Sequence, residues 1–93
     1  MENIILNTED LNPLIFHPGV FLLQKTAEHG LLKKDLARHL NILPNNLSQI
    51  FAGRRNVSVV MALKLEKVFE MSAEYWIGLQ YAYELQEARK MES

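Results

Sequence analysis

The sequence contains no cysteine, and it has only four glycines and three prolines among 93 residues. The absence of cysteine excludes disulfide bonds, a thiolate zinc site and a cysteine nucleophile. So few glycines and prolines exclude collagen-like and linker-like chains. No apolar run approaches the roughly 20 residues that a membrane-spanning helix needs. Met1-Glu2-Asn3 also lacks the basic start of a signal peptide, so we expect a cytoplasmic protein.

The composition is that of one small globular domain, with 48% hydrophobic and 23% charged residues. The net charge of −1 hides a strong segregation along the chain. Residues 25–64 hold seven lysines and arginines against two carboxylates, a net charge of +5, and the segments on either side carry −3 each. A basic middle between acidic ends is a pattern typical of nucleic-acid binding, although small helical proteins also acquire such blocks by chance.

Turn-forming residues dominate the first 16 positions, where Asn7-Thr8-Glu9-Asp10 and Asn12-Pro13 follow Ile4-Ile5-Leu6. We expect residues 1–16 to form an irregular N-terminal arm with room for one short strand. Residues 17–93 are expected to form the domain.

From residue 17 onward the spacing of apolar residues predicts an all-α fold of five helices. Serine, proline and glycine mark their ends, because they suit helix caps and first turns. The expected helices are Pro18 to Gly30, residues 33–40, Pro44 to Gly53, one capped by Ser58, and one capped by Ser72 that runs to about Arg89.

The second and third helices are joined by only Asn41-Ile42-Leu43, which makes them a candidate helix-turn-helix. Side chains rotate by about 100° per residue around a helix. Leu47, Ile50 and Phe51 therefore share one apolar stripe that faces a core. Asn45, Gln49 and Ala52 fall on the opposite side, which is left for solvent or for a partner.

Two amides beside a small residue have the chemistry of a DNA base reader. Asparagine and glutamine match the N7 acceptor and N6 donor of adenine, and Ala52 can pack on a thymine methyl group. Lysine and arginine pairs flank the third helix and are placed to meet phosphates. Taken singly, exposed amides and basic pairs are usually solvated surface. The tight turn, the core stripe, the opposed amides and the flanking cations together favour DNA reading.

The stretch from Leu36-Ala37-Arg38-His39-Leu40 through Asn45-Asn46-Leu47-Ser48-Gln49-Ile50 to Gly53-Arg54-Arg55 resembles the helix-turn-helix of Cro/C1-type (XRE) phage repressors. His17-Pro18-Gly19 and the segment from Ser72 to Gln80 further resemble HigA-type antitoxins, in which an HPG tripeptide precedes helix one and a similar segment opens helix five. The resemblance covers about residues 17–86 and implies a phage-repressor-like fold.

The resemblance also implies roles for particular residues and partners. Base contacts would fall on Lys33, Asn45, Asn46 and Gln49, and phosphate contacts on Lys34, Arg54 and Arg55. The chain would be a homodimer that binds double-stranded operator DNA, represses its own operon and neutralises a RelE-like RNA-cleaving toxin. Leu32 and Leu43 depart from the family, which commonly has Ser or Thr as N-caps there, at a cost of about 1 kcal/mol each. Asn41 replaces the usual turn glycine but tolerates the left-handed conformation.

The fifth helix carries a stripe formed by Tyr75, Trp76, Leu79 and Tyr83. This stripe either closes the core of the monomer or forms a dimer or toxin surface, and the sequence leaves both options open. Tryptophan and tyrosine are favoured anchors of protein interfaces.

No catalytic, metal or cofactor site is predicted. His17, His29 and His39 lie ten or more residues apart, which specifies a zinc site poorly, and no glycine-rich phosphate loop is present. We therefore predict a DNA-binding antitoxin and not an enzyme. The alternatives are a stand-alone regulator of the same family without a toxin, and a toxin-binding module that reads DNA weakly.

Overall fold

The computed structural model describes residues 14–92, which form five α-helices and no strand. The helices are α2 (Pro18–Glu28), α3 (Lys33–Leu40), α4 (Pro44–Phe51), α5 (Val59–Phe69) and α6 (Ala73–Glu92). The predicted all-α fold is confirmed, and α6 runs three residues beyond the expected end at Arg89. No helix in the described range is long and apolar enough to cross a membrane. The expected N-terminal arm, with room for one short strand, falls mostly on residues 1–13, which lie outside the described residues.

Local side-chain caps explain where three of the helices begin. The Nδ1 atom of His17 accepts a hydrogen bond from the Gly19 backbone N–H at 2.9 Å at the start of α2. Ser58 Oγ accepts from the Met61 N–H, and Ser72 Oγ accepts from the Tyr75 N–H, both at 3.1 Å. Each bond satisfies one of the N–H groups that the first helical turn leaves free.

The two helices of the helix-turn-helix have no such cap. Leu32 and Leu43 precede α3 and α4 without any side-chain cap hydrogen bond, as the sequence predicts. The turn between these helices is nevertheless well formed, because Asn41 adopts a left-handed conformation with φ of 56°. The Ile42 N–H then reaches the Ala37 carbonyl at 3.0 Å and closes α3.

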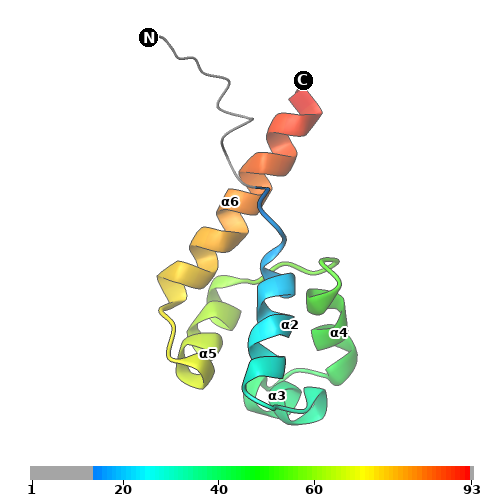
Figure 1. Cartoon of the computed structure of the whole chain (residues 1–93), viewed down its shortest axis with the longest axis vertical. Helices are drawn as coiled ribbons and strands as arrows, with labels where there is room; N and C mark the ends of the chain where they lie inside the picture. Colours follow the sequence, from blue (N-terminus) through cyan, green and yellow to red (C-terminus); the bar gives the residue numbers. More distant parts are fainter. Residues whose placement is uncertain (1–13, 93) are drawn as a thin grey trace.

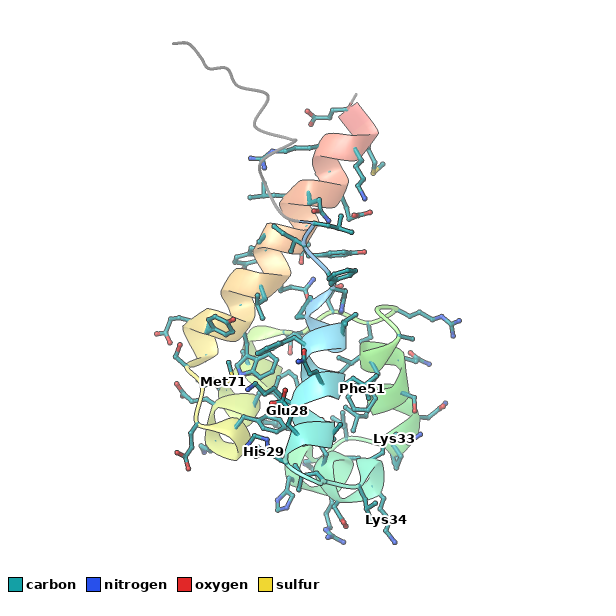
Figure 2. All side chains as sticks on the ribbon, viewed as in Figure 1. Glu28, His29, Lys33, Lys34, Phe51 and Met71 are labelled. Atoms are coloured by element: carbon teal, nitrogen blue, oxygen red, sulfur yellow. The ribbon has the colours of Figure 1, made fainter. Side chains whose placement is uncertain are left out.

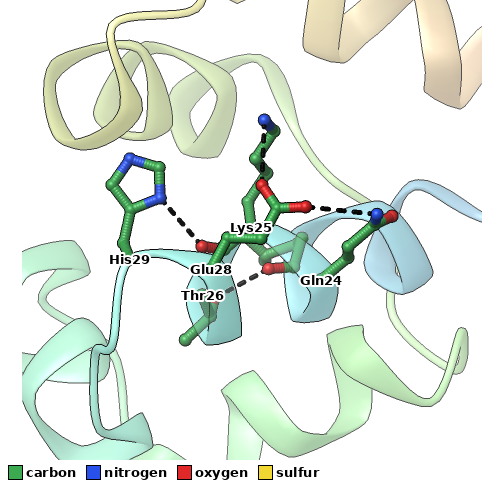
Figure 3. A network of polar contacts seen from close by, with 6 residues as sticks. Gln24, Lys25, Thr26, Glu28 and His29 are labelled. Atoms are coloured by element: carbon green, nitrogen blue, oxygen red, sulfur yellow. Dashed lines mark hydrogen bonds and ion pairs between the residues drawn. The ribbon is translucent and has the colours of Figure 1, made fainter.

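A small polar network closes the C-terminal end of α2 (Figure 3). Thr26 Oγ1 donates to the Leu22 carbonyl at 2.7 Å, and His29 Nδ1 donates to the Lys25 carbonyl at 3.0 Å. Glu28 accepts from Lys25 and from Gln24 on the exposed side of the helix. These bonds leave α2 with a defined end before the left-handed Gly30 turns the chain towards α3.

The core lies where α2, α3, α4 and α5 meet, and α6 lies across α5 and α2 before it projects beyond them (Figure 1). Trp76 of α6 is completely buried, with its ring 5.4 Å from Phe21 of α2 and 6.2 Å from Phe69 of α5. The structure therefore decides for the core in the case of Trp76. Of the two options that the sequence leaves open, a dimer or partner surface does not hold for Trp76, because the aromatic rings of two other helices enclose it.

His17 connects the start of α2 to two distant parts of the chain. Its ring meets Tyr83 of α6 edge-on, with 5.2 Å between ring centroids. Because Nδ1 accepts from Gly19, the ring proton sits on Nε2, which faces Asn56 Oδ1 at 3.4 Å in the loop after α4. One buried side chain thus links α2, α6 and the loop that follows α4.

Gly19 lets α2 and α4 approach each other at backbone distance. A Cβ atom at this position would lie 1.7 Å from the Ile50 carbonyl oxygen and 2.7 Å from its carbon. Only a residue without a side chain fits there, so Gly19 fixes where the end of α4 rests on α2. Gly78 of α6 is the natural contrast, because a Cβ there would meet nothing within 4 Å.

We expect Gly19→Ala to lower the free energy of unfolding by about 3 kcal/mol or more, because the Ile50 backbone cannot move aside as a flexible side chain would. Gly78→Ala should raise it by about 0.5–1 kcal/mol, since alanine favours an exposed helix interior over glycine. Urea denaturation of the two variants measures both effects. Equal stability of Gly19→Ala and the parent chain would contradict the close approach of α2 and α4.

Candidate nucleic-acid interface

A single apolar stripe packs α4 against the rest of the protein. Leu47 and Ile50 are buried and Phe51 is half-buried, and the helix packs on both α2 and α3. This is the core stripe that the sequence predicts. The side of α4 that carries no stripe residue is therefore turned away from the bundle.

Asn45, Gln49 and Ala52 form this outer face of α4. Asn45 and Ala52 are exposed and Gln49 is half-buried. The structure brings these three together as the sequence predicts. Asn46, a fourth predicted position, is half-buried and lines a shallow depression with Arg38 and Asn41 of the neighbouring helix and turn. Asn46 thus lies at the margin of the outer face and not at its centre.

Four cations surround the outer face. Lys33 and Lys34 are the first two residues of α3, and Arg54 and Arg55 lie in the turn after α4, past Ala52 and Gly53. Figure 2 places Lys33 beside α4 and Lys34 at the outer end of α3. All four are exposed, and none forms an ion pair with any residue of the described range 14–92. No carboxylate of the described range therefore pairs with these four cations.

Two features of the backbone also shape this end of the molecule. The Arg54 N–H bonds to the Gln49 carbonyl at 2.8 Å, which folds the basic turn back against the end of α4. The first turn of α3 begins without a side-chain cap, so its leading N–H groups have no side-chain acceptor, whereas α4 begins at Pro44, which has no N–H. Uncapped helix N-termini favour anions.

Lys33 makes a contact that the sequence does not predict. Its Nζ atom lies 2.7 Å from Ser48 Oγ and so joins the first residue of α3 to the second turn of α4. Ser48 is half-buried and is not one of the site residues that the sequence predicts. Its position three residues after Asn45 is the only signal in the sequence that could have found it.

The predicted surface on α6 is divided by the structure. Tyr75 is exposed, and Leu79 and Tyr83 are half-buried, with Tyr83 held partly inside the chain by His17. Further along, α6 exposes Tyr81, Leu85 and Met91. Gln86 binds the backbone of Ile15 through both its amide atoms, at 2.9 and 2.7 Å, so the exposed Leu14 and Phe16 lie beside this part of α6.

The helix-turn-helix (HTH_3) family model matches residues 23–76, which span α2 to the start of α6. The chain belongs to the helix-turn-helix family. A relative among known proteins is YddM of Escherichia coli (strain K12), an uncharacterized HTH-type transcriptional regulator, which is 32% identical over 73 residues that cover 78% of each chain. This assignment agrees with the resemblance to XRE-type repressors drawn from residues 36–55.

Two solved structures of HigA proteins are similar to this helix-turn-helix protein in both sequence and fold. HigA of Pseudomonas aeruginosa, solved with the higBA promoter, has a TM-score of 0.78 and 30% identity over 84% of this chain and 86% of its own. An addiction module antidote protein of the HigA family from Coxiella burnetii has a TM-score of 0.74 and 34% identity over 82% and 84% of the two chains. The predicted likeness to HigA-type antitoxins is confirmed at the level of sequence and fold.

Proposed function

We propose that this helix-turn-helix protein binds operator DNA as a dimer, represses its own operon and neutralises a RelE-like RNA-cleaving toxin. The observation that carries the DNA-binding part is the outer face of α4, which presents two amides and a small residue between four cations that form no ion pair within residues 14–92. P. aeruginosa HigA, whose fold this chain shares, was solved with promoter DNA.

The division of labour follows from the positions of the side chains. Asn45 and Gln49 each carry one acceptor and paired donors, which match the major-groove edge of adenine. Lys34, Arg54 and Arg55 lie at the two ends of the outer face, where the sugar–phosphate backbones on either side of a groove would run. Contacts to phosphate fix the position of the protein, and contacts to base edges select the sequence.

Binding sites selected from a randomised duplex pool test both roles. Gln49→Ala should lower the ratio of binding to the selected site over random DNA by about 5- to 150-fold, the value of one good bidentate base contact. Arg54→Ala should weaken binding to every duplex and reduce the dependence on salt, because each neutralised phosphate adds about −0.9 to the slope of log K against log salt. Both are measured by fluorescence anisotropy at several salt concentrations.

Gln24→Ala is the matched control, since Gln24 is exposed on α2 away from α4 and should leave both quantities unchanged. An unchanged ratio of specific to random binding in Gln49→Ala, or an affinity that does not respond to salt, would contradict the assignment of the outer face.

Dimerisation is proposed because one α4 contacts too few base pairs to select a site among many competing ones. Helix-turn-helix proteins meet this need by pairing, with half-sites about one helical turn apart. A self-complementary surface is then required. The projecting part of α6 offers one, since Tyr81 and Leu85 are exposed there beside Leu14 and Phe16. Tyr75, Leu79 and Tyr83, the other residues predicted on the surface of α6, lie on a different side of this helix, since side chains rotate by about 100° per residue.

Leu85→Glu should convert the dimer to monomers, because burying an unpaired carboxylate in an apolar interface costs more than the roughly 2–7 kcal/mol of a neutral polar group. Leu63→Glu on α5 is the matched control, as Leu63 is 49% exposed and Leu85 is 54% exposed. Light scattering gives the mass of each variant. A Leu85→Glu protein that stays dimeric with full affinity for DNA would place the interface elsewhere.

Toxin neutralisation is proposed from the comparisons with known proteins. It is supported by the likeness to HigA-family proteins described as antitoxins. A stand-alone regulator is the second candidate, because relatives such as YddM are described as transcriptional regulators. Expressing the adjacent open reading frame with and without this chain separates the two. Growth arrest that this chain relieves favours the antitoxin, and an adjacent product without effect on growth favours the regulator.

A further inference from the structure

The contact between Lys33 and Ser48 ties a flexible side chain to the helix that carries the outer face. Lysine loses up to about 2 kcal/mol of rotamer freedom when it is fixed, so an exposed lysine is ordinarily left free. Here the 2.7 Å bond from Nζ to Ser48 Oγ holds the ammonium group against α4 across 15 residues of sequence. Lys34, its neighbour, forms no such bond within residues 14–92 and extends from the end of α3 (Figure 2).

The direction of this hydrogen bond is fixed by chemistry. A lysine ammonium has three N–H groups and no acceptor, so Ser48 Oγ must be the acceptor. The Ser48 hydroxyl proton is therefore available to donate elsewhere. Ser48 does not bond back to the carbonyl four residues earlier, as Thr26 does to Leu22. Within the described range neither side chain has another hydrogen-bond partner. The pair thus presents three donors, two ammonium N–H groups and one O–H group, against the single lone pair that Ser48 Oγ has left.

The pair also lies beside the predicted base readers. Ser48 is three residues after Asn45 and four before Ala52, and residues at these spacings are neighbours on a helix surface. Ser48 therefore forms the edge of the outer face nearest to the start of α3. A DNA groove that receives Asn45 and Ala52 also receives the Lys33–Ser48 pair.

We propose that Ser48 is a further base-contacting residue, which acts with Lys33 as a donor-rich pair that favours guanine. Guanine alone presents two adjacent acceptors, N7 and O6, in the major groove. Cytosine presents the N4 amino group, and adenine presents the N6 amino group beside N7, so each offers fewer acceptors than guanine to the three donors of the pair. Thymine presents one acceptor, O4, beside its methyl group. This inference rests on the proposed DNA-binding function and adds a base preference to it.

Sites selected from a randomised duplex pool by the full chain and by its variants test this inference. The parent chain should select one invariant guanine in each half-site. Lys33→Met and Ser48→Ala should each lower the preference for guanine at that position by at least about fivefold, the lower limit for a good base contact. The double variant should lose little more than either single variant, because the two residues act as a unit.

Three further variants separate base reading from a structural role. Lys33→Arg and Ser48→Thr keep the donors and the acceptor, and they should keep the guanine. Lys34→Met should weaken binding to all duplexes equally and leave the selected sequence unchanged. Circular dichroism establishes that each variant is folded before its sites are selected.

The outcomes distinguish this inference from the function on which it rests. A parent chain that enriches no sequence contradicts the proposed function itself. A selected site without an invariant guanine, or one whose guanine survives both Lys33→Met and Ser48→Ala, contradicts the donor pair alone. A loss of affinity spread evenly over all positions of the site would also overturn it, because that result is expected if the bond only holds α3 and α4 together.

Discussion

The close approach of α2 and α4 at Gly19 is the constraint on which the rest of the structure depends. The Ile50 carbonyl occupies the space that any side chain at position 19 would need, so the end of α4 packs on the bundle in one defined position. Leu47 and Ile50 then have to point inward, and Asn45, Gln49 and Ala52 have to point outward. The contact between the backbones of α2 and α4 therefore sets the orientation of the outer face. The two helix N-termini that lack caps are not needed to orient it.

His17 extends this constraint to the rest of the chain. It caps α2 two residues before the helix contact, and its ring also meets Tyr83 of α6 and faces Asn56 after α4. Buried Gln80 adds a second link, because its Oε1 accepts the Val57 N–H at 2.8 Å. The loop that carries Arg54 and Arg55 is thus tied to the same helix that projects from the bundle (Figure 1). A dimer built on α6 would hold two outer faces at a fixed separation.

The features that could be predicted from the sequence are those governed by local chemistry. The starts of α2, α5 and α6 follow from His17-Pro18, Ser58 and Ser72, and the apolar spacing of α4 gives its two faces directly. The features that could not be predicted depend on residues distant in sequence. The sequence around Trp76 fits both a core and a surface position, and its place in the core depends on Phe21 and Phe69 of two other helices. Ser48 is marked in the sequence only by its spacing from Asn45, because its contact is made by a lysine 15 residues earlier.

The most direct test of the outer face as the DNA-binding surface is a map of backbone amide shifts in NMR spectra of the chain titrated with a selected duplex. The largest changes should fall on residues 45–49 of α4, on Lys33 and Lys34, and on residues 52–55. The amides of α5 between Met61 and Phe69 should stay nearly unchanged, because that helix lies behind the core. Changes concentrated in α5 or in the projecting part of α6, with α4 unaffected, would contradict the assignment.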